Sequence, residues 1–319
     1  MDDRTNGTES RAVRGDEGLR LMVALDFSQS SLRALEWAGA LANGRKAVVH
    51  LVHAIEPTPL ANIADAAGSL CDLGEKRLHR AAEGLRIRGV ETRSHVDIGR
   101  PWQVVRSVAA RVAPDLVLLG NRGLSPIKRV LLGSNADRVL RTIEAPTLLV
   151  HAADAPPERL RVLIATDFSE DADEAARAFR ALFSRSLLRY EVRVLHAALP
   201  QAVTESVDVP LIERVDWPQL EAEATGMAES VARPFRSDGT EATVAIERGG
   251  SARTILGEAR AWRADLIVLG RRGASGFERM LLGSTAERVM HGAACAVFSA
   301  QRAPVEAALP GRARAAYIA

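Results

Sequence analysis

The 319-residue chain has little of several residue types, and each shortage excludes a class of protein. Two cysteines, Cys71 and Cys295, are too few for a disulfide framework or a thiolate zinc site. Aromatic residues make up only 4% and the net charge is +2 without a basic block, which disfavours a nucleic-acid-binding surface. No apolar run approaches the roughly 20 residues that span a bilayer, and the polar N-terminus lacks the apolar core of a signal peptide. We therefore expect a cytoplasmic protein with neither nucleic acid nor membrane as a partner.

The chain contains one unit written twice, which indicates a tandem duplication. PDLVLLGNRGLSPIKRVLLGSNADRVL (114–140) aligns without a gap with ADLIVLGRRGASGFERMLLGSTAERVM (264–290), at a separation of 150 residues. The unit starts, LRLMVALDFSQSS (19–31) and LRVLIATDFSEDA (160–172), are 141 residues apart, so the second copy has nine extra residues, which we place in 200–219. The expected organisation is a polar tail at 1–18, domains at 19–152 and 160–300, a linker at 153–159 and a C-terminal tail at 301–319.

Strand-like and helix-like patterns alternate within each copy. Short apolar runs such as LRLMVAL, AVVHLVHA, DLVLLG and PTLLV read as buried parallel strands, and each has a counterpart in the second copy. Between them, helical spacing predicts helices at 30–42, 100–113 and 71–89, the last one ended by Gly89. This alternation predicts an α/β fold with two tandem Rossmann-like domains, each an open parallel sheet covered by helices on both faces.

Each copy carries the pattern Gly-x2-Gly-x9-Gly-Ser. The pattern begins directly after a buried strand and ends where a helix begins, so unpaired N–H groups and a hydroxyl would face a crevice suited to phosphate. The alternative is that these glycines serve only turns and helix caps. There is neither a P-loop lysine nor a Gly-x-Gly-x-x-Gly after the first strand. The residues are Gly120, Gly123, Gly133 and Ser134 in the first copy, and Gly270, Gly273, Gly283 and Ser284 in the second.

These motifs resemble the universal stress protein family. ALDFS (24–28), LVHA (51–54), DLVLLGNRG and LLGSNADRVL carry the resemblance in the first copy, and ATDFS, VLHA, DLIVLGRRG and LLGSTAERV carry it as closely in the second. The resemblance covers the chain from residue 19 to about 300. It implies a five-stranded parallel sheet in the order 3-2-1-4-5 for each domain and, for the branch with this signature, binding of ATP with or without Mg²⁺.

The resemblance also implies which residues form the two sites. Asp26 and Asp167 would lie at the adenine–ribose end, although each is as readily a carboxylate that orients its loop, and a general-base role finds no partner acid. The adenine slots would be lined by Ala24, Leu25, Ala54 and Leu119, and by Ala165, Thr166, Ala197 and Leu269. Ribose and phosphates would be held by Gly120, Gly123, Gly133, Ser134 and Asn135, and by Gly270, Gly273, Gly283, Ser284 and Thr285.

The sequence departs from the family pattern at two positions. Asn135 stands where a small or β-branched residue usually follows Gly-Ser, which weakens the case for the first site relative to the second. Ala296 replaces the proline that commonly opens the last strand, which is Pro146 in the first copy, and that change concerns only the scaffold.

Several other reactive residues have an ordinary structural explanation. His53 and His196 occupy equivalent strand ends, where we favour packing with one satisfied hydrogen bond over a catalytic or metal role. Cys295 is expected to be a small core residue. Arg122 and Arg272 lie inside the glycine loops, where either a phosphate contact or simple solvation is possible. No histidine set has metal-ligand spacing.

The resemblance implies an ATP-binding sensor or regulator of the stress response that acts through an unidentified protein partner. Without a P-loop lysine or an evident set of water-activating residues, fast hydrolysis is not expected. Two alternatives stay open: a slow ATPase or nucleotide-transferring enzyme on the same scaffold, and a scaffold with unoccupied pockets.

The last strand of each copy is an apolar sheet edge, PTLLV (146–150) and AVFSA (296–300). Exposed edges are normally paired or covered. The resemblance implies pairing through this strand. We therefore expect the two copies to form an intramolecular pseudo-dimer about a pseudo-two-fold axis. Further association of two chains into a homodimer stays open.

Overall fold

The computed structural model describes residues 18–56, 64–121, 132–198, 216–273 and 282–302. Within them the strands are β1 (Leu19–Ala24), β2 (Ala47–Ile55), β3 (Glu91–Ile98), β4 (Leu116–Gly120), β5 (Thr147–Val150), β6 (Arg159–Thr166), β7 (Arg189–Ala197), β8 (Ala242–Glu247), β9 (Leu266–Gly270) and β10 (Ala296–Ala300). The helices are α1 (Gln29–Ala42), α2 (Ala64–Ala81), α3 (Glu83–Ile87), α4 (Pro101–Val112), α5 (Ser134–Thr142), α6 (Glu170–Phe183), α9 (Trp217–Ser237), α10 (Ser251–Ala261) and α11 (Ser284–Gly292).

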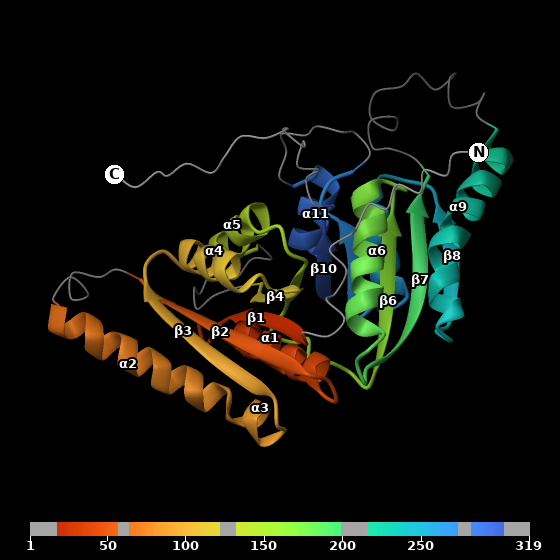
Figure 1. Cartoon of the computed structure of the whole chain (residues 1–319). Coiled ribbons are helices and arrows are strands. Elements are labelled where there is room, and N and C mark those ends of the chain that lie inside the picture. Colours follow the sequence, from red (N-terminus) through yellow and green to blue (C-terminus); the bar gives the residue numbers. More distant parts are fainter. Residues whose placement is uncertain (1–17, 57–63, 122–131, 199–215, 274–281, 303–319) are drawn as a thin grey trace, which may run out of the picture.

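All ten strands belong to one continuous sheet in the order β3-β2-β1-β4-β5-β10-β9-β6-β7-β8 (Figure 1). Each half has the order 3-2-1-4-5 counted along its own strands, and all pairs inside a half are parallel. The halves join where β5 pairs with β10, and this one pairing is antiparallel. The two copies are therefore related by a pseudo-two-fold axis at this seam, as the apolar last strands and the family resemblance together predict.

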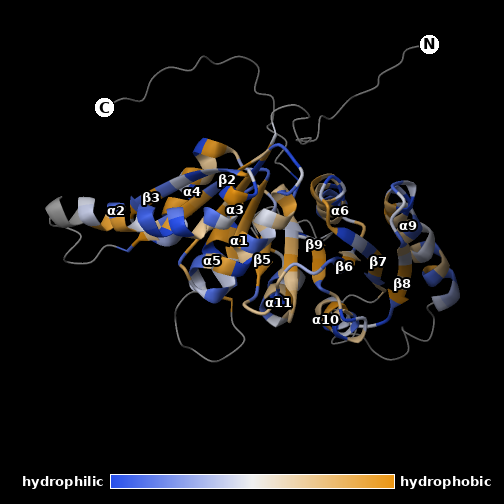
Figure 2. Cartoon of the chain, turned by 90° about the horizontal axis from the view of Figure 1, so that it is seen from below, coloured by the Kyte–Doolittle hydropathy of each residue, from blue (hydrophilic) through white to orange (hydrophobic). Residues whose placement is uncertain are grey.

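The strands form the centre of the molecule because they are apolar on both sides. β4 and β9 read LVLLG and LIVLG, and their first four residues are buried. Two hydrophobic cores result, one on each face of the sheet, and both run through the two halves. One core packs under α1, α2, α6 and α9, and the other under α4, α5, α10 and α11. Figure 2 shows the apolar colour gathered on the strands and on the helix sides that face them.

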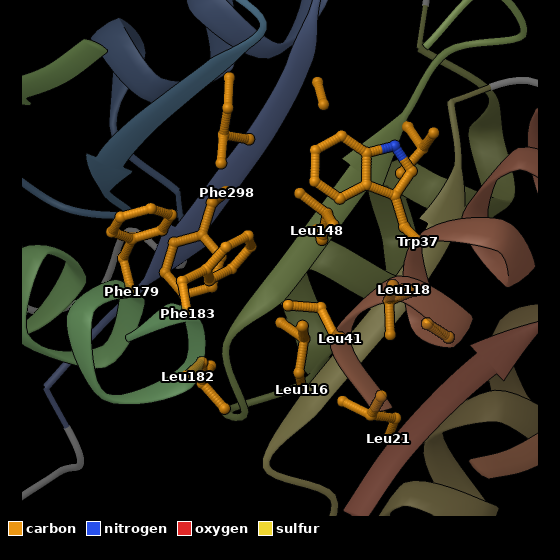
Figure 3. Packing of buried hydrophobic residues seen from close by; sticks show 14 of the residues in the cluster. Leu21, Trp37, Leu41, Leu116, Leu118, Leu148, Phe179, Leu182, Phe183 and Phe298 are labelled. Carbon is orange, nitrogen blue, oxygen red and sulfur yellow. The ribbon is translucent and has the colours of Figure 1, made fainter. Parts of the chain in front are cut away.

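Aromatic residues fill the core on one face of the seam. Phe298 of β10 lies with its ring centroid 5.9 Å from that of Phe179 and 6.3 Å from that of Phe183, both on α6. From the first half, Trp37 of α1 approaches Phe183 at 6.5 Å and donates its Nε1–H to the Asp154 carbonyl at 2.7 Å. Figure 3 shows this group meeting across the two strands. Because these side chains come from both halves, separating the halves would expose a shared core.

Local residues set the starts of two helices, and one predicted helix has different bounds. Ser28 caps α1 by accepting the Ser31 N–H, and Pro101 is the first residue of α4. The helix predicted over 71–89 is wrong in its bounds, because it begins at Ala64 and is divided at Ala82 into α2 and α3. The division directs Leu85 onto α1, where Gly39 leaves room for it: a Cβ at Gly39 would lie 2.8 Å from Leu85 Cδ2.

Two expected features fall mainly outside the described residues. The nine-residue insertion assigned to 200–219 lies outside them as far as residue 215, and α9 begins at Trp217. The tails lie outside them apart from Gly18 and residues 301–302. Among the helices that the structure does describe, none is long and apolar enough to cross a membrane.

Candidate functional site

The glycine loops lie at the carboxyl ends of β4 and β9, beside the carboxyl ends of β1 and β6. These are the points where the strand order of each half reverses, and ligands of open α/β sheets bind there. Ala24 at the end of β1 is in register with Leu119 of β4, so the turn after β1 and the start of the first glycine loop are neighbours. The second half repeats the arrangement with β6 and β9.

The turn after the first strand is held by its aspartate in both halves. Asp26 Oδ1 accepts the Ser28 N–H at 2.9 Å, and Asp167 Oδ1 accepts the N–H of Ser169 at 3.1 Å and its hydroxyl at 2.5 Å. The residue between them, Phe27 or Phe168, has a φ of 63° or 59°, a left-handed conformation that side chains rarely adopt. These carboxylates therefore act at least as supports of a strained turn, which is the loop-orienting alternative.

The equivalent histidines support the same turn from the neighbouring strand. His53 Nδ1 lies 2.7 Å from the Leu25 carbonyl oxygen, and His196 Nδ1 lies 2.9 Å from that of Thr166. Since a carbonyl oxygen only accepts, each Nδ1 carries the proton. Burial lowers the pKa of His53. Each histidine thus has the one satisfied hydrogen bond that we expect from the sequence.

The first glycine of each loop is required by a helix. A Cβ at Gly120 would lie 2.5 Å from Ser30 Oγ and 2.7 Å from Ser31 N, and a Cβ at Gly270 would lie 2.6 Å from Ala172 N. These atoms belong to the first turn of α1 or α6, so the strand end and the helix start pack backbone against backbone. For Gly120 and Gly270, helix packing alone accounts for the glycine.

The end of each loop returns to its start. The Gly133 N–H donates to the Asn121 carbonyl at 2.8 Å, and the Gly283 N–H donates to the Arg271 carbonyl at 2.7 Å. Gly133 and Gly283 are the N-caps of α5 and α11, and neither can offer a side-chain cap. The first N–H groups of a helix have no carbonyl partner within it, and they carry its positive dipole end. Ser134 and Ser284, the first residues of these helices, are exposed at this end.

The middle of each loop differs in how much can be described. Gly123 lies outside the described residues, and so does Arg122. Gly273 is exposed, and a Cβ there would lie 2.8 Å from Asp167 Oδ2. In the second half the glycine loop therefore starts against the aspartate of the first turn, which brings these two elements of the predicted site together.

The predicted adenine-slot residues divide into two groups. Leu25, Leu119 and Leu269 are each 3–4% exposed and belong to the two cores, so their side chains are enclosed by the protein. Ala165 and Thr166 are also buried, and Thr166 Oγ1 accepts the Phe168 N–H at 2.9 Å. The members left partly open at the sheet edge are Ala24, Ala54 and Ala197.

Arg272 is engaged by an acid that lies close to the loop. Its Nε and Nη2 donate to the two carboxylate oxygens of Asp171 at 2.9 and 3.1 Å, and its own N–H donates to Asp171 Oδ2. Asp171 stands in the first turn of α6 and also accepts the Arg302 N–H at 3.0 Å. The structure adds an ion pair with Asp171 to the two alternatives for Arg272, which were phosphate contact and solvation. The signal was an acid at 171 where the first copy has Ser30.

The neighbouring arginine escaped the sequence analysis altogether. Arg271 stands where the first copy has Asn121, and it is fully buried. Its guanidinium crosses the seam and donates to the carbonyls of Ile143 and Ala145 in the first half. The available signal was that a charged residue replaces a neutral one directly after the first glycine of the loop.

Two surface hollows lie away from the glycine loops. One of about 370 Å³ is lined by Ala40, Asn43, Arg88, Glu158 and residues 187–189. The other, of about 290 Å³, lies at the seam beside Trp37, Asp154 and Cys295. Burial raises the pKa of Asp154 to about 6 and that of the Cys295 thiol to about 12, so Cys295 is a half-buried, unreactive thiol rather than a nucleophile. Among the described residues no group of three His, Cys, Asp or Glu side chains could hold a metal ion.

Comparison with known proteins identifies the family. A universal stress protein of Mycolicibacterium smegmatis is 28% identical over 86% of this chain and 94% of its own length, and one of Mycobacterium tuberculosis is 29% identical over the same shares. A solved universal stress protein from Archaeoglobus fulgidus matches with a TM-score of 0.68, 23% identity and coverage of 89% of this chain and 98% of its own. The model of the universal stress protein family matches residues 19–151 and again 158–299. The chain therefore belongs to the universal stress protein family, with two family domains in tandem.

Proposed function

We propose that each half binds one ATP at its glycine loop, and that nucleotide occupancy regulates a protein partner in the stress response. One observation carries the proposal: at both sheet edges the loop closes on itself and presents the start of a helix, Ser134 or Ser284, beside the aspartate turn. This arrangement offers backbone N–H donors, a hydroxyl and a helix dipole in one place, which suits a phosphate group without a lysine.

The electrostatics of the helix starts support an anion. The first acidic side chains of α5 and α11 are Asp137 and Glu287, the fourth residue of each helix. Both are bonded to Arg141, at 3.0 Å and 2.6 Å, and this pairing reduces their repulsion of a phosphate. Mg²⁺, where present, would arrive with the nucleotide and be held chiefly by phosphate oxygens, as is usual for this ion.

A binding role is favoured over an enzymatic one by how the aspartates are used. Asp26 and Asp167 accept hydrogen bonds from the turn that they support, whereas a general base must face the attacking water. A slow ATPase remains the competing function. Incubating the purified protein with ATP and measuring phosphate over hours separates them, because a binding protein leaves the ATP intact and a slow ATPase releases phosphate steadily.

The site-specific test uses charge at the helix starts. Ser134→Glu and Ser284→Glu add an acid to an exposed first helical residue, which the helix dipole favours, while repelling phosphate. We expect each variant to fold and to bind one nucleotide fewer per chain by calorimetric titration, and the double variant to bind none. Ser134→Ala and Ser284→Ala are the matched controls: they remove one hydroxyl but keep the N–H groups, so each site should weaken only several-fold. Undiminished ATP binding by the double Glu variant would place the nucleotide elsewhere.

A further inference from the structure

The side chain of Arg271 joins the second glycine loop to the first half of the chain. Its Nη1 donates to the Ile143 carbonyl, and its Nη2 donates to the Ala145 carbonyl at 2.7 Å and to Thr147 Oγ1 at 3.1 Å. Only the Nε bond, to Ser299 Oγ at 3.3 Å, stays in the second half. Three of these four hydrogen bonds therefore cross the seam.

This guanidinium depends on those acceptors. It is 0% exposed, and all four of its acceptors are neutral. A buried charge without a counter-ion is costly unless its donors are satisfied. Burial lowers the pKa of Arg271 to about 10, so it remains a cation at neutral pH. Three of its four acceptors belong to the first half. The position of the Arg271 side chain therefore depends on how the two halves are joined at the seam.

The backbone of the same residue fixes both ends of the second loop. The Arg271 N–H donates to the Ala300 carbonyl at 2.9 Å, and its carbonyl accepts the Gly283 N–H at 2.7 Å. Gly283 is the N-cap of α11, where the phosphate-facing N–H groups begin. A shift of Arg271 would therefore be transmitted to the helix start through a single hydrogen bond.

The first half has the same backbone hydrogen bonds, but a different residue pair of the seam lies on its side. Asn121 donates to the Val150 carbonyl and accepts from Gly133, both at 2.8 Å. Leu148 and Phe298 form the central register pair of the seam, and on the face of Arg271 the pairs to either side differ. One is Thr147 with Ser299, whose hydroxyls are 2.8 Å apart; the other is Leu149 with Val297, which is apolar.

We propose that Arg271 is a positioning residue of the second nucleotide site, through which the affinity of that site depends on an intact β5–β10 seam more strongly than the affinity of the first site does. This inference rests on the proposed function. It makes the two sites unequal: the loss of the hydrogen bond between Thr147 and Arg271 weakens nucleotide binding at the second site and not at the first.

The antiparallel seam allows a test from the other half of the molecule. Thr147 begins β5 and is in register with Val117, whereas Gly120 at the first site is in register with Val150 at the far end of β5. Thr147 belongs to the half that holds the first site, yet it contacts Arg271, which we call the anchor of the second site. If a substitution of Thr147 weakens only the second site, the effect cannot come from its place in the first half and must pass through its contact with Arg271.

The experiment measures ATP affinity in full-length chains with only one open site. Ser134→Glu leaves the second site open, and Ser284→Glu leaves the first. With the second site open, Thr147→Val should weaken binding about fivefold, the lower end of the range for coupled sites. Thr147→Ser, which keeps the hydroxyl, should restore affinity to within about twofold of the parent. With the first site open, neither variant should change affinity.

The proposal fails if Thr147→Val affects both sites equally or affects neither, while the parent chain still binds ATP. If the parent chain binds no ATP, the proposed function fails, and hydrogen exchange without nucleotide still decides on the anchor. Arg271→Asn, which copies the residue of the first half, and Thr147→Val should both speed amide exchange at 284–286 and leave 134–136 unchanged. If the substitutions speed exchange equally at the two helix starts, Arg271 does not hold the second helix start in place. The same holds where Arg271→Asn reduces the overall stability of the chain.

Discussion

The two glycine loops share a backbone and differ in what surrounds it. In both, the loop end donates to the residue after the first glycine, and that residue donates to the last strand. The second loop adds a buried cation, Arg271, and an arginine bonded to Asp171, where the first copy has Asn121 and Ser30. Duplication has thus kept the hydrogen-bonded frame, whereas the side chains have divided the halves into an anchored loop and a loop without this anchor.

The largest expected effect comes from removing the anchor. Arg271→Met leaves the Ile143 and Ala145 carbonyls without their buried donors, and each such loss costs about 1–3 kcal/mol. We expect the free energy of unfolding to fall by about 3 kcal/mol in urea titrations. Asn121→Ala, the matched change in the first half, should cost less than about 1 kcal/mol. Equal losses in the two variants would contradict the difference between the loops.

The next largest loss of stability should come from replacing the first glycine of either loop. This loss should be the same in both halves, so it serves as the reference for the comparison. Gly120→Ala and Gly270→Ala each press a methyl group onto the first turn of a helix, at 2.5–2.7 Å from its nearest atoms. Overpacking against backbone should cost each about 2 kcal/mol. Gly273→Ala is the control, because its Cβ would meet only the Asp167 carboxylate, which can move. If Gly273→Ala destabilises the chain as much as the other two, helix packing is not the reason for the first glycine.

A smaller effect should come from Asp171, the acid of α6 that contacts the second loop and has no counterpart beside the first. Asp171 is buried and accepts hydrogen bonds from Arg272 and Arg302. Asp171→Asn keeps the shape but loses the charge, which should lower the unfolding free energy by about 1.5 kcal/mol. Ser30→Ala is the control at the equivalent position and should cost about 0.5 kcal/mol. Thermal unfolding of the two variants in parallel gives the comparison, and a larger loss for Ser30→Ala would reverse it.

The smallest effect is a pH dependence at the other end of the seam. Burial raises the pKa of Asp154 from 3.8 to about 6. Well below pH 3.8 both the folded and unfolded forms are protonated; as the pH rises from 3.8 to about 6 the unfolded form ionises first, so the folded state loses stability. Asp154→Asn should therefore equal the wild type in stability at about pH 3 and exceed it at about pH 7.5. The gain should be about 1 kcal/mol, because solvent screens this half-buried group. A pH-independent difference in urea titrations would refute this.

Much of the fold was predictable because its signals are local or repeated. The apolar runs indicated the strands and the internal repeat indicated the two halves. The apolar last strands PTLLV and AVFSA indicated a covered edge, and the family resemblance implied that they pair with each other at the seam. The break at Ala82 was not predictable, since it depends on Leu85 fitting against Gly39 on a distant helix. The helix requirement for Gly120 was missed for the same reason: the pattern of glycines does not say which backbone approaches them.

The location of the candidate site could be predicted from the sequence, whereas most of its side-chain contacts could not. The edge of the sheet, the aspartate turn and the helix starts come directly from the order of strands, glycines and Gly-Ser. The role of Arg271 depends on carbonyls more than 120 residues earlier in the chain, and no local pattern encodes such a pairing. Comparison of the two copies position by position shows Arg271 as one of several differences in the loop, and does not show that it is buried.

The antiparallel join of β5 and β10 also changes how the molecule responds to dilution. Two separate subunits joined by one strand pair would dissociate at low concentration, whereas halves on one chain meet at an effective concentration that dilution does not alter. A symmetric pair of subunits would also carry the same residue at both ends of the strand pair. On a single chain, one end can hold Arg271 with Thr147 and Ser299 while the other stays apolar. Covalent fusion thereby allows an asymmetric pair, in which the first half supplies hydrogen-bond acceptors that hold a loop of the second half.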